Sequence, residues 1–273
     1  MLQALLNYNF LQNAVIAGIL SGIICGIIGV IITEKKMLMM SGGIAHTAYG
    51  GVGLGYLLGF EPIIGAGIFS IVSAVIIGKI NRKTNIQSDI IISLLWSMGM
   101  ALGVAFTALM PGYPPDMNSY LFGNILSVTM SDIYSIFILS IITLIFTITF
   151  WQDWKSFLFD KDFAYVMGIN TAFLEYSLLF LVALCIVVLI RVVGIILVIA
   201  LLSAPAACAS LLTKTLKNRM LLSVAFCIAF CIIGLTLSYY LGIPSGATIV
   251  FTAVITYFTI FILSTKLNYK KIK

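Results

Sequence analysis

Charged side chains are scarce in this sequence. Only 9% of its residues are Asp, Glu, Lys or Arg, whereas 62% are apolar or aromatic and the mean hydropathy is +1.17. An ordinary soluble domain carries about 25% charged residues, which help to cover its surface. The scarcity of charge therefore excludes a soluble enzyme, a disordered chain and a nucleic-acid-binding protein.

Signature motifs of several enzyme classes are also missing. The sequence contains no H-E-x-x-H, no G-x-S-x-G and no G-x-x-x-x-G-K-[ST], which are metalloprotease, hydrolase and nucleotide-binding signatures. The one histidine, His46, has no Asp or Glu near it in sequence to orient it as a general base. We expect that the chain is not an enzyme and that any ATP is hydrolysed by a partner.

Long apolar runs, by contrast, are abundant. A helix needs about 20 apolar residues to cross a bilayer, and these runs are apolar all round, unlike the alternating strands of a membrane barrel. The sequence predicts an all-α polytopic membrane protein, one domain over 1–273, with about eight or nine transmembrane helices. The runs lie at approximately 10–33, 42–60, 62–79, 88–110, 129–151, 173–190, 192–213, 220–241 and 246–265.

The basic residues fall between these runs. Apart from Arg191, the fifteen Lys and Arg residues form five clusters. If the chain crosses the membrane at each run, all five clusters lie on one side, which the positive-inside rule identifies as the cytoplasm. We expect a multi-pass plasma-membrane protein in contact with lipid, with its N-terminus outside and its C-terminus in the cytoplasm.

A cluster of glycines surrounds the single histidine. Seven glycines lie between Ser41 and Gly59, although each costs up to about 1 kcal/mol in a helix. Helical spacing puts four residues of this stretch on one face, a groove of bare backbone with the imidazole of His46 projecting into it. We predict that His46 binds a metal ion, while a hydrogen bond to a neighbouring helix is the structural alternative. The face comprises Gly42, His46, Gly50 and Gly53.

Two prolines predict interruptions of helices. Pro205 lies inside an apolar run, where it predicts a broken or kinked helix that lines a pathway together with Gly42, Gly43, Gly50 and Gly53. Pro244 predicts a second break, which starts the last span. The five cysteines lie inside apolar runs and are expected to be small buried hydrophobes, although Cys208, near Pro205, is a second candidate metal ligand.

Residues 152–172 form the longest polar connection on the predicted cytoplasmic side. A short amphipathic helix is expected there, ended by a glycine in the C-cap position. Its acidic ends favour docking on a protein over binding to anionic lipid. The residues predicted to dock are Phe159, Asp160, Asp162, Phe163, Ala164, Met167 and Gly168.

Several segments, in the same order along the chain, resemble motifs of the permease subunits of zinc and manganese ABC importers, the ABC-3 family. The resemblance extends from about Glu34 to the C-terminus and covers nearly the whole chain. The segments that carry it are Met40–Gly53, Trp96–Val104 (WSMGMALGV), Tyr120–Leu126 (YLFGNIL), Phe159–Ile169 (FDKDFAYVMGI), Val193–Leu212 (VGIILVIALLSAPAACASLL) and Gly234–Val250 (GLTLSYYLGIPSGATIV).

The resemblance implies a permease for a divalent transition metal, zinc or manganese. A second copy of the chain, cytoplasmic ATP-binding subunits and an extracellular metal-binding protein would be its partners. Residues 160–168 would be the element that couples to the ATPase. The metal would be cargo, with no cofactor bound permanently.

One position departs from the family pattern. The family places an aspartate four residues before its metal histidine, and Gly42 stands there in this sequence. His46 alone remains of that pair, which weakens the case for manganese, an ion that favours carboxylate oxygens. An importer of another metal or of a metal chelate, and a channel that works without ATP, are the alternatives.

Overall fold

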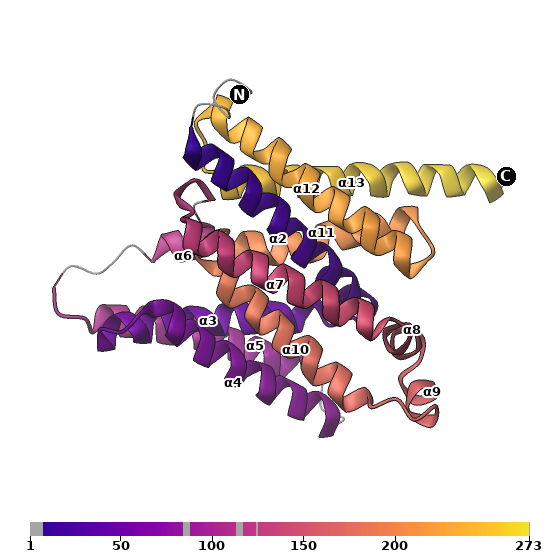
Figure 1. The fold of residues 1–273 in the computed structure, drawn as a ribbon, viewed down its shortest axis with the longest axis horizontal. Coiled ribbons are helices and arrows are strands. Elements are labelled where there is room, and N and C mark those ends of the chain that lie inside the picture. Colours follow the sequence, from indigo (N-terminus) through magenta and orange to yellow (C-terminus); the bar gives the residue numbers. More distant parts are fainter. Residues whose placement is uncertain (1–7, 84–87, 113–116, 124, 273) are drawn as a thin grey trace.

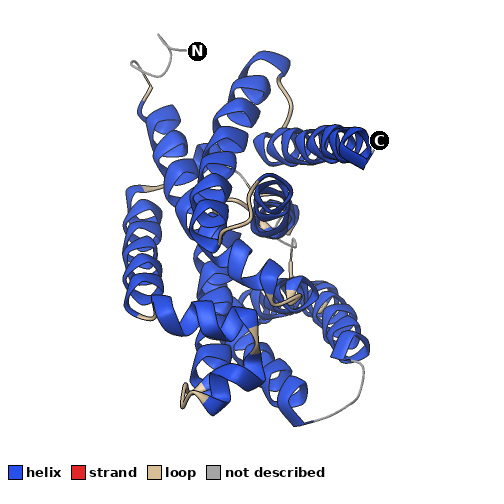
Figure 2. Ribbon diagram, turned by 90° about the vertical axis from the view of Figure 1, so that its right-hand side faces the viewer, coloured by secondary structure: helices blue, strands red, loops and turns tan. Residues whose placement is uncertain are grey.

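The computed structural model describes residues 8–83, 88–112, 117–123 and 125–272 of the chain. Throughout these ranges every regular element is a helix (Figure 2), as the sequence predicts. The long helices are α2 (Asn9–Glu34), α3 (Leu38–Leu58), α4 (Pro62–Lys83), α5 (Ser88–Ala108), α7 (Met130–Thr149), α10 (Thr171–Ile190), α11 (Ile195–Leu212), α12 (Leu216–Leu241) and α13 (Ser245–Ile272). The short ones are α6 (Asn118–Phe122), η1 (Ile125–Ser127), α8 (Trp151–Phe159) and α9 (Lys161–Val166).

Eight of the long helices in the described ranges are apolar and long enough to cross a membrane. The prediction of an all-α polytopic membrane protein is therefore confirmed. The remaining long helix, α3, carries the glycine cluster and His46, which lower its hydropathy. Every residue of α3 from Met40 to Gly53 is buried, so protein surrounds this stretch and replaces the lipid that other helices face.

One pair of polar side chains lies at each end of the bundle and identifies that end. Arg219, at the start of α12, pairs with Glu34 at the end of α2, and we call this the basic end. At the opposite end, the hydroxyl groups of Tyr56 and Tyr120 lie 3.2 Å apart. Figure 1 shows α8 and α9 side by side at the basic end.

The helices form two groups joined by α10. On one side, α3 packs most extensively against α5 and α4. On the other side, α2 packs against α12 and α11, and α13 against α11 and α12. Figure 1 shows α12 and α13 at the top of the bundle and α3, α4 and α5 at the bottom. Since α10 contacts α4, α3, α7 and α2, it connects the two groups.

Glycines let the helices around α3 approach very closely. A Cβ atom at Gly50 would lie 2.8 Å from the carbonyl oxygen of Gly99 on α5, and one at Gly53 would lie 2.7 Å from that of Gly103. On the side facing α4, a Cβ at Gly51 would overlap the carbonyl oxygen of Gly65. Close backbone approach of this kind is how small residues hold membrane helices together.

Pro205 does not break its helix. The predicted break is wrong, because α11 is one helix from Ile195 to Leu212 with Pro205 buried inside it. Proline lacks the N–H that would bond to the carbonyl of Leu201 one turn earlier. The thiol of Cys227 on α12 donates to that oxygen instead, at 3.5 Å. A neighbouring helix thus satisfies the freed backbone group, which lets proline remain inside a membrane helix.

The second predicted interruption is present. α12 ends at Leu241, Gly242 adopts a left-handed conformation with φ +67°, and α13 begins at Ser245 directly after Pro244. The carbonyl of Pro244 accepts the backbone N–H of Thr248, which closes the first turn of α13. Proline immediately before a helix costs no hydrogen bond, since the first N–H groups of a helix have no partner within it.

The backbone contact between α3 and α4 predicts a large difference between two glycine-to-alanine variants. Gly51→Ala forces α3 and α4 apart and is expected to lower the free energy of unfolding by about 1–3 kcal/mol or more. Gly67→Ala on α4 is the control, since its Cβ would lie 3.9 Å from the nearest atom, Val187 Cγ1. Thermal unfolding in detergent measures both, and equal stability of the two variants would contradict this account of the packing.

Candidate functional site

His46 lies in the middle of α3, where its imidazole faces α5. Its Nδ1 lies 3.2 Å from the Sδ atom of Met100, and its ring stacks on the indole of Trp96 with centroids 3.9 Å apart and 15° between the planes. The residue is 9% exposed. A nitrogen and a thioether sulfur therefore lie together beside the half-buried indole of Trp96, a combination that suits softer metal ions.

Trp96 also fills the space beside Gly42. A Cβ at Gly42 would lie 3.0 Å from Cζ3 of the indole, which is closer than side chains normally approach. An aspartate at this position would therefore displace the ring that stacks on His46. Glycine at position 42 thus leaves the space that the indole of Trp96 occupies.

The four predicted pathway glycines do not line an open groove in this structure. Gly42 and Gly43 face the side chains of Trp96 and Ile92, and Gly50 and Gly53 lie against the backbone of α5. The fifth residue of that set, Pro205, is buried on α11. What sequence spacing presents as a bare face is filled by α5, because the matching glycines of α5 let the two helices meet.

Cys208, the second candidate metal ligand, is fully buried on α11. Its role as a ligand stays a prediction. Among the residues described, no three His, Cys, Asp or Glu side chains cluster closely enough to hold a metal ion. Within the described residues, the potential ligand that lies beside the ring nitrogen of His46 is the thioether of Met100.

The segment 152–172 contains two short helices at the basic end. Asp160 caps α9, because its Oδ1 accepts the backbone N–H groups of Asp162 at 2.8 Å and Phe163 at 2.9 Å. Gly168 follows α9 with φ +80°, a left-handed conformation that glycine adopts at little cost. The predicted short helix and its glycine cap are confirmed, and each has a local cause in the sequence.

The outer face of this segment is apolar and has no covering within the described chain. Ala164 is fully buried and fixes the inner face of α9. An exposed apolar patch of this kind is typical of a surface that contacts a partner protein or lipid. The exposed fractions are Phe159 87%, Phe163 52%, Tyr165 73%, Val166 82% and Met167 65%.

The inner face of α8 is anchored to the turn between α2 and α3. Trp154 and Phe157 of α8 are buried, at 0% and 1% exposure. The Nζ atom of Lys35 donates to the carbonyl oxygen of Phe157 at 2.5 Å and lies 3.5 Å above the centre of its ring. Burial of the ammonium group, together with the nearby positive charge of Lys161, lowers the pKa of Lys35.

A buried carboxylate on α10 binds three polar side chains at this end of the bundle. Glu175 is 2% exposed and accepts from Asn81 Nδ2 at 2.5 Å, Lys161 Nζ at 2.9 Å and Arg82 Nη1 at 3.3 Å. Glu175, Asn81 and Lys161 border a cavity of about 260 Å³ that Lys35 and Phe157 also line. Removing a buried carboxylate from partners of this kind is costly, because their charges would be left without compensation.

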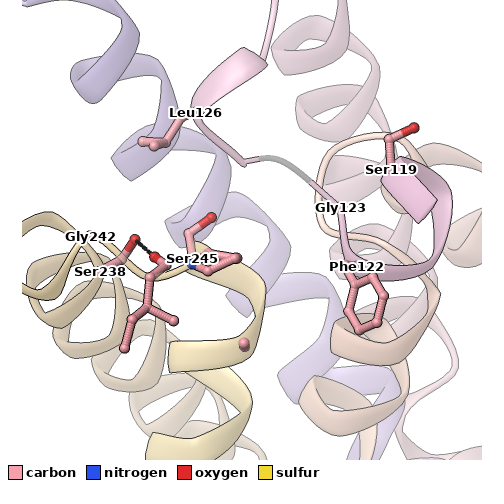
Figure 3. A pocket seen from close by; sticks show the side chains of 10 residues that line it. Ser119, Phe122, Gly123, Leu126, Ser238, Gly242 and Ser245 are labelled. Atoms are coloured by element: carbon pink, nitrogen blue, oxygen red, sulfur yellow. Dashed lines mark hydrogen bonds between the residues drawn. The ribbon is translucent and has the colours of Figure 1, made fainter. Parts of the chain in front are cut away.

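A larger cavity of about 730 Å³ lies at the opposite end, between α6, η1 and the turn from α12 to α13 (Figure 3). Ser119 and Ser245 belong to a lining that is mainly apolar, and Ser238 donates to the carbonyl of Ile243 at 2.7 Å. Among the described residues, the lining of this cavity consists of serines, glycines, a proline and apolar side chains.

Sequence reasoning missed three residues of the candidate site. Met100 and Trp96 are separated from His46 by about 50 positions, and apolar residues of α5 carry no sign of which one meets an imidazole. Glu175 did carry a signal, because an acidic residue within an apolar run is costly unless it is paired and functional.

The whole chain has clear relatives. The model of the ABC 3 transport family matches residues 7–264. The chain is 37% identical to a manganese transport system membrane protein of Listeria monocytogenes, covering 97% of this chain and 94% of that protein. It is 33% identical to a manganese import system permease protein of Streptococcus gordonii, covering 100% and 98%.

A solved structure shares the fold. The structure described as PsaBC from Streptococcus pneumoniae in complex with Fab contains a chain that is 32% identical and superposes with a TM-score of 0.88. The match covers 99% of this chain and 98% of that one. The arrangement of helices described above is therefore one that an experimentally solved relative also adopts.

Proposed function

Since the chain belongs to the ABC 3 transport family, we propose that this membrane permease carries a divalent metal ion, manganese or zinc, into the cytoplasm with energy from ATP hydrolysed by a partner subunit. A second copy of the chain completes the membrane part. Cytoplasmic ATP-binding subunits drive the permease, and an extracellular metal-binding protein delivers the ion. The chain itself catalyses no reaction and holds no permanent cofactor.

The single observation that carries the ATP-driven mechanism is the uncovered apolar face of α9. An ATP-independent channel has no need for a capped helix, α9, that presents Phe163 to the surroundings together with the flanking side chains Phe159 and Met167. A groove on an ATP-binding subunit would bury these side chains. The docking helix therefore favours an ABC importer over a channel or facilitator.

Two observations bear on the choice of metal. The relatives from Listeria monocytogenes and Streptococcus gordonii are named as manganese transport proteins, which supports manganese. His46 has the thioether of Met100 as its neighbour and lacks the carboxylate excluded at Gly42, which supports the softer zinc ion. We propose that the ion passes His46 in transit, with water and backbone oxygens as its other ligands.

The proposed orientation follows from the charges. The basic end carries Lys35, Arg82, Lys161 and Arg219, and the positive-inside rule assigns such an end to the cytoplasm. α9 then faces the compartment that contains ATP. The N-terminus lies outside the cell and the C-terminus in the cytoplasm.

Substitution of the ligand tests the role of His46. His46→Gln is expected to lower metal uptake at least about tenfold at equal subunit abundance, since even residues behind a metal ligand are worth about 10- to 100-fold in affinity. Met100→Leu keeps the volume and removes the sulfur, so it should reduce zinc uptake more than manganese uptake. The control is Met98→Leu, which lies on the exposed face of α5. Full uptake by His46→Gln would reject the ligand role.

Substitution on the docking face tests the ATPase partner. Phe163→Asp removes an apolar contact worth about 1.5–3 kcal/mol and is expected to weaken assembly with the ATP-binding subunit at least about tenfold. Phe163→Leu retains an apolar surface and serves as the control. Co-purification and ATP-dependent uptake measure the effect. Unchanged assembly of the aspartate variant would show that this face does not dock.

Labelling of single cysteines tests the orientation. Lys217 lies at the exposed start of α12, and Glu61 lies at the exposed turn before α4 at the opposite end. With the native cysteines replaced, Glu61→Cys should react with a membrane-impermeant thiol reagent in intact cells, and Lys217→Cys should react only after permeabilisation. The reverse pattern would invert the proposed topology.

A further inference from the structure

Glu175 is a buried carboxylate that takes no part in the proposed passage of metal. Its side chain is 2% exposed, and both oxygens accept hydrogen bonds, Oε1 from Asn81 and Oε2 from Lys161 and Arg82. A buried carboxylate strongly resists losing its partners, because no water is available to replace them. Glu175 therefore couples the movements of the helices that supply its partners.

The partners come from different parts of the bundle. Asn81 and Arg82 belong to the last turn of α4, Glu175 is the fifth residue of α10, and Lys161 is the first residue of α9. α9 is also the helix whose other face is apolar and uncovered. One carboxylate thus ties the docking helix to two long helices of the bundle.

A second tether runs parallel to the first. Lys35 binds the carbonyl oxygen and the ring of Phe157 on α8, and α3 with His46 begins three residues after Lys35. The cavity of about 260 Å³ lies between the two tethers. It gives the charged side chains room to shift, whereas the backbone contacts of α3 with α4 and α5 leave none.

We propose that Glu175 is a positioning residue through which movement of α8 and α9 is transmitted to α4 and α10. The proposal rests on the proposed function, since it takes the ATP-binding subunit as the source of the movement. Lys161 is the transmitting contact, because among the described residues it is the α9 side chain that pairs with Glu175. Arg82 and Asn81 pass the displacement to α4, which packs against the helix of His46.

The test removes the transmitting contact and leaves the buried carboxylate paired. In Lys161→Gln, Glu175 keeps Arg82 and Asn81, so the fold is preserved. The reconstituted transporter should then move at least about fivefold less metal per ATP hydrolysed, the smallest effect of a typical coupling between sites. Lys161→Arg retains the cation and should restore the ratio. Lys79→Gln is the matched control, since Lys79 is exposed on α4 and forms no ion pair with any residue in the described ranges.

A measurement on the permease alone separates this proposal from the proposed function. Hydrogen exchange of residues 79–82 and 171–176 should be faster in Lys161→Gln than in the parent chain and unchanged in Lys79→Gln. Unchanged exchange in Lys161→Gln, or an unchanged ratio of metal to ATP, would overturn the relay. A parent transporter that moves no metal would reject the proposed function, while hydrogen exchange would still decide whether Lys161 links α9 to the bundle.

Discussion

Direct contact between helix backbones around α3 is the constraint on which the rest of the structure depends. The glycines of α3 meet the carbonyl groups of Gly65, Gly99 and Gly103, so α3, α4 and α5 behave as one body. This body fixes the imidazole of His46 against Trp96 and Met100. It also fixes the last turn of α4, whose polar side chains hold Glu175. The candidate metal ligand and the charged junction are thus two ends of the same rigid unit.

The sequence predicts the fold class well because apolar length is a sufficient signal for a membrane helix. It also predicts the cap of α9, since Asp160 and Gly168 act on their own neighbours. It fails at Pro205, where the thiol that completes the helix lies on α12. It fails again at the glycine face, which looks open until the glycines of α5 are placed against it. The misses share one cause, a partner distant in the sequence.

The site residues also divide into those that the sequence reveals locally and those that depend on a residue distant in the sequence. His46 stands out as the one histidine, and a helical wheel places it on the glycine face without knowledge of other helices. The thioether beside it and the indole beneath it become visible only when α5 is docked. Glu175 is conspicuous in the sequence as an acid within an apolar run, yet its meaning depends on which cations reach it. An acidic residue within an apolar run thus marks the position of a site in the sequence, whereas the side chains that complete the site are identified only from the packing of the helices.

The shared volume of Gly42 and Trp96 has a consequence for substitutions at either position. The hydrogen of Gly42 is the largest substituent that the indole tolerates without moving. An aspartate introduced at position 42 would bring an oxygen toward His46 only if the side chain at position 96 shifted or were replaced by a smaller one. A substitution on α3 is therefore sensitive to the residue that α5 places beside it.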